Sequence, residues 1–241
     1  MTVDIEIPLA GGGRLNGALA RPASGGTQPG VIVIHEVFGD QPEIRGVCDA
    51  FAARGYVAVM PDLFSAGGLR AVCVARAMIE VSSGRPGRVS GYIEESRAWL
   101  ARQEGVDRDR IGVIGFCIGG GFALSYVATC RPGIRAASIN YGDVPKEAER
   151  LRGACPIVAS YGARDRVVGP QGRRLRDHLE QLGIEHDIKV YDQAGHGFMT
   201  EGSHPIGKLV FLPMRLGYAP VAAADAWQRV FAFFDQHVKS A

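Results

Sequence analysis

The chain has few cysteines and no long apolar run, and each of these absences excludes a class of protein. The five cysteines are odd in number, widely spaced and free of any CxxC pair, so they predict neither a disulfide framework nor a zinc site. No apolar stretch approaches the ~20 residues that span a bilayer, and the N-terminal MTVDIEIPLAGGG has no basic segment followed by an apolar one. We therefore expect a soluble, unexported, cytoplasmic protein with no membrane partner.

An excess of one charge is also missing. The 27 basic and 25 acidic residues give a formal net charge of +2 and are spread along the chain, which does not predict the concentrated basic face of a nucleic-acid-binding protein. The GGG at 119–121 lacks the lysine and spacing of a phosphate loop, and no dinucleotide fingerprint is present. His35 and His204 stand in no spacing typical of a metal site. We expect no nucleic-acid partner, no cofactor and no metal.

The chain does contain two kinds of apolar segment in alternation. Short apolar runs bounded by turn residues are typical of strands buried on both faces of a parallel sheet, and they lie at 31–35, 56–60, 111–116, 136–141, 156–161 and 186–191. Segments with helical spacing lie between or after them, at 43–54, 69–81, 90–103, 120–130, 170–182 and 221–238. With a hairpin expected within residues 3–20, this alternation predicts one α/β domain over residues 1–241, a mostly parallel central sheet with helices on both faces.

The segment GVIGFCIGGGF, residues 112–122, places Cys117 between Gly115 and Gly119 where a predicted strand meets a predicted helix. Active sites of such sheets gather beyond the carboxyl ends of the strands, and a turn with glycines on both sides of a nucleophile exposes it for attack. The alternative is a packed thiol, because free cysteine is among the most buried residue types. The strand-to-helix context favours the nucleophile.

Two further residues complete a catalytic set. A thiol must ionise to attack, so Cys117 needs a base. Asp165 directly follows one predicted strand and His196 directly follows another, which gives the order nucleophile, acid, base of α/β-hydrolases. Taken singly, Asp165 is explained as a helix cap and His196 as a turn residue. Because all three residues fall at strand ends in this order, we predict a catalytic triad.

Several stretches extend the likeness to a known family: VIVIHEVFG (31–39), VMPDLF (59–64), GVIGFCIGGG (112–121), YGARDRVV and AGHGF. With them the chain resembles the dienelactone hydrolases of the α/β-hydrolase superfamily over nearly its whole length. The resemblance implies an α/β-hydrolase fold with Cys117, His196 and Asp165 as the triad. It also implies that the backbone amides of Val37 and Ile118 form the oxyanion hole.

The same resemblance implies a role for Glu36. In the family, a glutamate at this position contacts the resting thiol and takes its proton when substrate displaces it, so that a thiolate forms only when needed. A buried carboxylate beside a thiol is costly unless the two share a proton, which makes this role physically reasonable. The alternative is that Glu36 is a solvated loop residue.

The chain departs from the family pattern where substrate is held. Family members acting on dienelactone bind its carboxylate with arginines, one of them four residues after the catalytic histidine, where this chain has Thr200. Arg70 and Arg76 are candidates for the other arginine, with a solvated helix face as the alternative, and Lys208 is a further candidate anchor. We expect Phe198 to form an apolar wall of the pocket rim and dienelactone itself not to be the substrate.

These residues together predict a cofactor-independent hydrolase of a small carboxylic ester or lactone that acts through an acyl-Cys117 intermediate, as a monomer or small homo-oligomer. The alternative is a non-catalytic ligand-binding or thiol-sensing protein on a hydrolase fold. A complete triad argues against that alternative, because a binding protein needs no acid to orient its histidine. The fold alone names no substrate.

Overall fold

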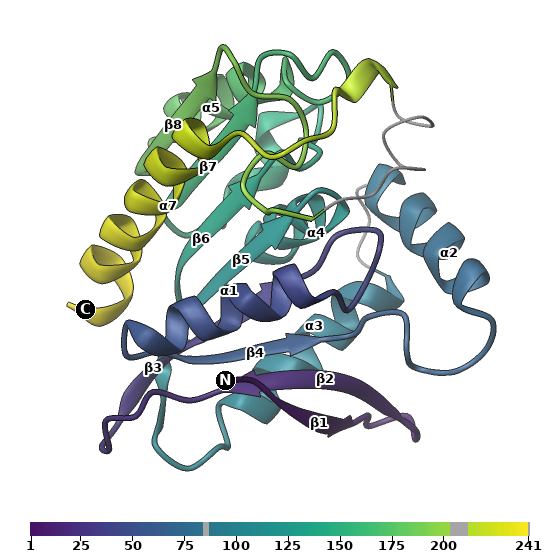
Figure 1. The fold of residues 1–241 in the computed structure, drawn as a ribbon, viewed down its shortest axis with the longest axis vertical. Coiled ribbons are helices and arrows are strands. Elements are labelled where there is room, and N and C mark those ends of the chain that lie inside the picture. The colour runs from purple at the N-terminus through teal and green to yellow at the C-terminus, as the bar shows by residue number, and fades with distance from the viewer. Residues whose placement is uncertain (84–86, 203–211, 241) are drawn as a thin grey trace.

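An eight-stranded sheet runs through the centre of the computed structural model, which describes residues 1–83, 87–202 and 212–240 (Figure 1). The strand order is β1-β2-β4-β3-β5-β6-β7-β8. Strands β1 and β2 are antiparallel to their neighbours, and the other six strands, β3 to β8 by number, are parallel to one another. The strands are β1 Val3–Pro8, β2 Arg14–Ala20, β3 Gln28–Ile34, β4 Val57–Pro61, β5 Val106–Phe116, β6 Ile134–Asn140, β7 Ile157–Gly162 and β8 His186–Tyr191. The predicted hairpin and mostly parallel sheet are confirmed.

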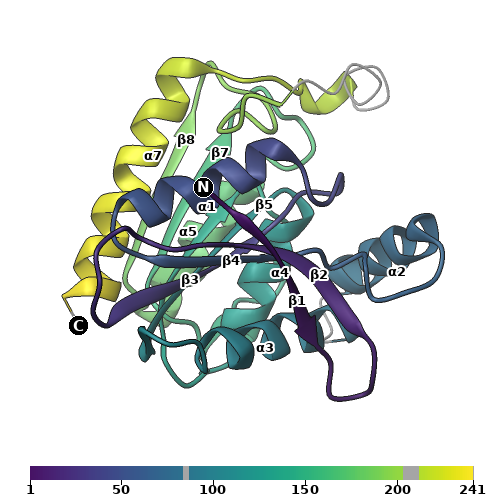
Figure 2. The ribbon, with the colours of Figure 1, turned by 60° about the horizontal axis from the view of Figure 1, so that its bottom comes forward.

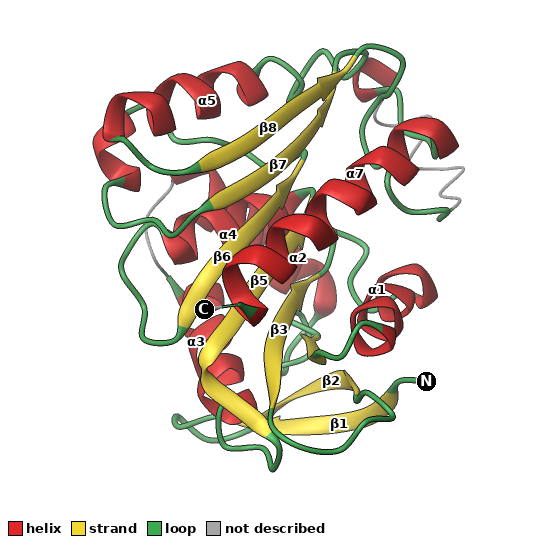
Figure 3. Cartoon of the chain, turned by 90° about the vertical axis from the view of Figure 1, so that its left-hand side faces the viewer, coloured by secondary structure: helices red, strands yellow, loops and turns green. Residues whose placement is uncertain are grey.

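Helices cover both faces of this sheet, as predicted. They are α1 Pro42–Ala53, α2 Arg70–Ser83, α3 Arg88–Leu100, α4 Ile118–Val127, α5 Gln171–Leu182 and α7 Pro220–Phe234, with short helical turns at Ala148–Leu151, Leu212–Met214 and Asp235–Lys239. Helices α1 and α7 lie on one face, and α3, α4 and α5 lie on the other (Figure 3). Helix α2 projects from the side and buries only Ala77 (Figure 2).

The continuous apolar run of β3 shows why the sheet is covered on both sides. Successive side chains of a strand point to opposite faces. Val31 and Val33 pack in the core layer beneath α1 and α7, whereas Ile32 and Ile34 pack in the opposite layer, and all four are fully buried. Both faces of the strand therefore require apolar residues, which is the pattern that predicted it.

Most element boundaries differ from the prediction by one to three residues, and three further differences have a structural reason. Strand β5 begins at Val106 because the polar segment 106–110 continues the ladder with β3 beyond the apolar run. Helix α7 ends at Phe234 and continues as a wider helical turn. Tyr141, expected to end a strand, lies beyond β6 in a left-handed conformation with φ 42°. Lys208 and His204 lie outside the described residues.

No helix among the described residues is long and apolar enough to cross a membrane.

Candidate active site

Cys117 occupies a strained turn between the last residue of β5 and the first residue of α4. Its φ of 56° and ψ of −122° are unusual for a residue other than glycine, and such strain is found most often at functional sites. Its N–H donates to the Asn140 carbonyl at 3.1 Å, and its own carbonyl accepts from Gly120 N–H at 2.9 Å. Hydrogen bonds thus hold the turn from both sides, and Cys117 remains half-buried.

The two glycines that flank this turn are required by close packing. A Cβ atom on Gly115 would lie 2.1 Å from the Gly119 carbonyl oxygen, and one on Gly119 would lie 2.4 Å from the His35 carbonyl oxygen. Helix α4 therefore starts directly against β5 and the end of β3. This packing brings Cys117 next to the loop that carries Glu36.

Asp165 joins the histidine to the loop after β7. Its Oδ2 accepts a hydrogen bond from His196 Nδ1 at 2.7 Å, and its Oδ1 accepts from the N–H groups of Val167 at 2.9 Å and Val168 at 3.0 Å. The side chain is fully buried. The carboxylate therefore bonds both the imidazole and the turn ahead of α5, whose N-cap is Pro170 rather than Asp165.

His196 is buried and presents one free ring nitrogen. Burial disfavours the imidazolium, but an anionic sulfur at Cys117, close to the ring, and the hydrogen bond to Asp165 outweigh burial and raise the pKa of His196 to about 10. Nδ1 is committed to Asp165, whereas Nε2 is buried without a hydrogen-bond partner among the described residues. The backbone of the histidine is tied to the segment before α7, since its N–H donates to Met214 and its carbonyl accepts from Gly217. Nε2 is therefore positioned to accept a proton.

Glu36 follows β3 by two residues and is half-buried. Its carbonyl accepts hydrogen bonds from His35 Nδ1 at 2.7 Å and from Gly39 N–H at 2.9 Å, and its Oε1 accepts from the Tyr141 hydroxyl at 3.4 Å. The other ring nitrogen of His35 accepts from Leu63 N–H at 3.0 Å. His35 is thus a structural residue that holds the Glu36 backbone.

Tyr141 is a site residue that the sequence analysis missed. It is 1% exposed, and its ring centroid lies 4.9 Å from that of His196. Burial and the charges of Glu36 and Cys117 raise its pKa well above the ordinary value. The signal was a tyrosine at the carboxyl end of a strand, a place where site residues gather, but the apolar run before it favoured a core position.

Backbone strain is concentrated at this site. Cys117, Tyr141 and Arg215 are the non-glycine residues with positive φ in the described part of the chain. Cys117 and Tyr141 lie in the site, and the Arg215 carbonyl lies 1.9 Å from where a Cβ atom on Gly195 would be, directly before His196. Strain of this kind costs about 1–3 kcal/mol per residue and persists only where the surroundings enforce it.

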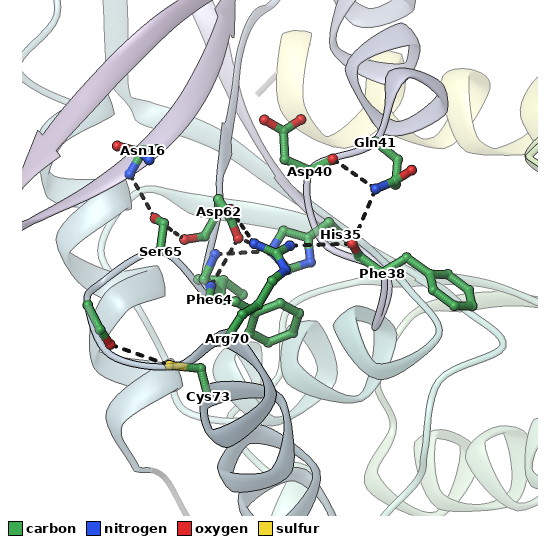
Figure 4. A network of polar contacts seen from close by, with 12 residues as sticks. Asn16, His35, Phe38, Asp40, Gln41, Asp62, Phe64, Ser65, Arg70 and Cys73 are labelled. Carbon is green, nitrogen blue, oxygen red and sulfur yellow. Dashed lines mark hydrogen bonds and ion pairs between the residues drawn. The ribbon is translucent and has the colours of Figure 1, made fainter.

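Arg70 belongs to a polar network that reaches the loop after β3 through the Phe38 carbonyl (Figure 4). Its guanidinium donates to Asp62 Oδ2 at 3.0 Å and to the Phe38 carbonyl at 3.3 Å, and it lies 5.5 Å above the centroid of the Phe64 ring. Burial raises the pKa of Asp62, but the neighbouring His35, Arg70 and Phe64 amide together lower it to about 2.

The remaining sequence candidates lie in different surroundings. Arg76 is on the exposed face of α2. Phe198 is fully buried and packs against Tyr141 and Tyr191, with ring centroids 5.8 and 5.1 Å away. It therefore packs in the core behind the site and does not form the exposed wall of a pocket rim that we predicted. Thr200 is 9% exposed. It lines a cavity of about 20 Å³ together with Glu36, Phe38, His196, Gly197, Gly202, Leu216 and Gly217.

Comparison with known proteins relates this arrangement to one family. The model described as the dienelactone hydrolase family matches residues 15–238. A protein provisionally named carboxymethylenebutenolidase from Salmonella typhimurium is 29% identical over 233 residues, covering 90% of this chain and 81% of that protein. One of the same provisional name from Synechocystis sp. is 29% identical over 264 residues, covering 99% and 100%.

A solved structure agrees with the sequence comparisons. The crystal structure of a provisionally named dienelactone hydrolase from Klebsiella pneumoniae superposes with a TM-score of 0.80 at 27% identity, covering 98% of this chain and 99% of that one. Together with the observed strand order, this confirms the predicted α/β-hydrolase fold.

Proposed function

The chain belongs to the dienelactone hydrolase family and is an ester or lactone hydrolase, and we propose that it works without a cofactor through Cys117, His196 and Asp165 and an acyl-cysteine intermediate. One observation carries this proposal. The His196 ring is bonded through Nδ1 to a fully buried Asp165 at 2.7 Å and keeps a buried, unpartnered Nε2 among the described residues. A proton acceptor held in this way suits a nearby thiol.

The reaction follows from these positions. The Cys117 thiolate attacks the carbonyl carbon, and the developing oxyanion is stabilised by the amides of Val37 and Ile118. Ile118 supports this role because it is the first residue of α4, and the first amides of a helix have no intrahelical acceptor. Protonated His196 then gives its proton to the leaving alkoxide, and the neutral ring activates the water that hydrolyses the thioester.

Glu36 controls when the thiolate forms in this proposal. A carboxylate near the sulfur disfavours a second negative charge there, so the resting thiol keeps its proton until substrate displaces it. The carboxylate then takes this proton and passes it to His196, which later gives it to the leaving alkoxide. The charges at Cys117 and His196 are coupled, because the raised pKa of His196 depends on the anionic sulfur. The Tyr141 hydroxyl, 3.4 Å from Glu36 Oε1, supports the carboxylate in this position.

Thr200 determines the charge of the preferred substrate. It stands four residues after His196, where family members that bind an anionic lactone have an arginine, and it lines the catalytic cavity. A buried carboxylate without a cation suffers a desolvation penalty of several kcal/mol, which neutral substrates avoid. We expect a higher kcat/KM for an uncharged ester than for its carboxylated analogue, with a smaller difference in Thr200→Arg. A native preference for the anion would contradict this reasoning.

Mass spectrometry of the intact protein tests the mechanism. After mixing with p-nitrophenyl acetate, we expect steady turnover and a transient acetyl adduct that maps to Cys117, both absent in Cys117→Ala. Undiminished turnover by Cys117→Ala would refute the proposed nucleophile. Stoichiometric ester binding without turnover by the native protein would instead favour the ligand-binding or thiol-sensing alternative.

A further inference from the structure

A second and larger cavity adjoins the catalytic one. It has a volume of about 630 Å³ and lies between α1 and α7, which share one face of the sheet. Val47 and Ala50 of α1, Met199, and Trp227 and Phe231 of α7 supply apolar surface to its walls. It is not used by any step of the mechanism above.

Thr200 lines both cavities and therefore links them. The catalytic cavity, at about 20 Å³, is close to the size of a single water molecule. It has room for little more than a water-sized group beside His196, so we expect the rest of a substrate to extend away from this residue. Thr200 is the one residue that the described linings of both cavities share, so a group that extends past Thr200 would reach the larger cavity.

The walls of the larger cavity select an uncharged, apolar group. Trp227 stacks on Phe231 with centroids 5.4 Å apart, and its N–H already donates to the Met199 carbonyl at 3.0 Å, so the indole offers only apolar surface. Glu43 and Glu201 are the charged residues among the described lining, and Glu43 Oε2 is buried without a partner within the described residues. A substrate carboxylate brought here would be repelled by both glutamates.

We propose that the cavity between α1 and α7 is a subsite for the apolar arm of an uncharged ester substrate. This inference rests on the proposed function. It specifies a substrate class: a neutral ester whose acyl or alcohol portion carries several methylene groups or a ring beyond the reacting carbonyl.

Gly46 allows the subsite to be filled without distorting the helix. It lines the cavity within α1, and a Cβ atom added there would meet no atom within 4 Å. Gly46→Phe should therefore place a ring in the cavity. Gly91 in α3, on the other face of the sheet, also has no atom within 4 Å of an added Cβ. Gly91→Phe is the matched control.

The experiment measures kcat/KM along two homologous series, p-nitrophenyl acyl esters of increasing acyl length and acetate esters of increasing alcohol length. In the native enzyme we expect a rise of up to about fourfold per methylene in one series. Gly46→Phe should abolish this rise while leaving the acetyl member of the p-nitrophenyl series within about twofold, and Gly91→Phe should keep the rise. A terminal carboxylate on the long chain should also abolish it.

A native enzyme without length dependence in either series would overturn the subsite, as would a Gly46→Phe variant that loses short and long esters equally. Failure of the proposed function is recognised separately, because the same esters would then be hydrolysed no faster by the native protein than by Cys117→Ala.

A different observation carries a second inference, about Arg70. Besides its bonds to Asp62 and the Phe38 carbonyl, it packs directly on the backbone of Gly39, where φ is +80° and a Cβ atom would lie 1.7 Å from Arg70 Nη2. Gly39 N–H in turn donates to the Glu36 carbonyl. The guanidinium thus joins the loop after β4 to the loop that carries Glu36 and the Val37 amide (Figure 4).

We infer that Arg70 is a positioning residue for this loop rather than a carboxylate anchor. Two of its five N–H donors are engaged within the protein, one by Asp62 and one by Phe38. Losing it should let the Val37 amide and Glu36 shift, which lowers turnover of every ester to the same degree, because the loop serves the reacting carbonyl and not the substrate's charge.

Paired neutral and carboxylated esters test this inference on Arg70→Met, with Arg76→Met from the exposed face of the same helix as control. We expect kcat of Arg70→Met to fall about 10- to 100-fold on both esters, with KM within about twofold. Arg70→Lys should recover only part of the loss, because an ammonium does not reproduce the guanidinium fork. A raised KM confined to the carboxylated ester would identify Arg70 as an anchor and overturn the inference, as would an unchanged kcat.

Discussion

Replacing Asp165 by asparagine and by alanine should separate its two functions. Asparagine keeps a carbonyl oxygen for the amides of Val167 and Val168 but turns an NH₂ group toward His196 Nδ1, which favours the wrong imidazole tautomer. We expect kcat to fall by about 10⁴. Stability should fall by only about 1 kcal/mol, since one hydrogen bond is exchanged for a poorer contact.

Alanine at Asp165 removes all three hydrogen bonds in a fully buried place. Each of two backbone amides left unsatisfied costs about 1–3 kcal/mol, so the free energy of unfolding should drop by about 4 kcal/mol in total. The loss of kcat should be at least as large as for asparagine. The two variants should thus be similar in inactivity and differ in stability.

The assays are kcat with p-nitrophenyl acetate and urea unfolding at pH 7. Asp192→Asn, at an exposed aspartate on the loop before His196, is the matched control and should change neither quantity. If Asp165→Asn kept kcat within about tenfold of native, Asp165 would not act through the tautomer of His196. If both Asp165 variants were equally stable, the argument from Val167 and Val168 would fail.

Three other measurements check the remaining groups. Cys117→Ala and His196→Ala should each lower kcat by several orders of magnitude, with the double variant barely worse, because the triad acts as a unit; additive losses would contradict a shared mechanism. Iodoacetamide should alkylate Cys117 slowly at pH 6 and faster at higher pH, and rapid alkylation at pH 6 would indicate a permanent thiolate paired with protonated His196. Glu36→Gln should lower the rate of hydrolysis without unfolding the protein. The pKa of Asp62 is about 2 in the folded protein and near 3.8 in the unfolded chain. The ionised carboxylate therefore stabilises the fold above pH 3.8, and this stabilisation is lost as the pH falls through about 2. Between pH 4 and pH 2 the free energy of unfolding, measured with urea, should fall by up to about 2 kcal/mol more in the native protein than in Asp62→Asn. Identical pH profiles of the two proteins would contradict this assignment.

The sheet and the order of the site residues were predictable from the sequence because both are encoded locally. The burial of β3 on two faces appears as a run of apolar residues, and the strained turn at Cys117 appears as two glycines at fixed distances from it. Asp165 and His196 were identified because parallel strands end at one edge of a sheet, so residues that follow different strands meet there. For these features, position along the chain carries the spatial information.

The contacts of individual side chains were decided by tertiary packing. Nothing local distinguishes Arg70 from Arg76. Both are exposed, yet Arg70 joins two loops because it lies at the start of α2 beside Asp62. Tyr141 ends an apolar run like other core residues, but a left-handed turn places its hydroxyl beside Glu36, more than a hundred residues away in the chain. The cavity between α1 and α7 depends on how two helices from opposite ends of the sequence pack on one face of the sheet. Such distances are set by the summed packing of many distant residues, which no local pattern contains.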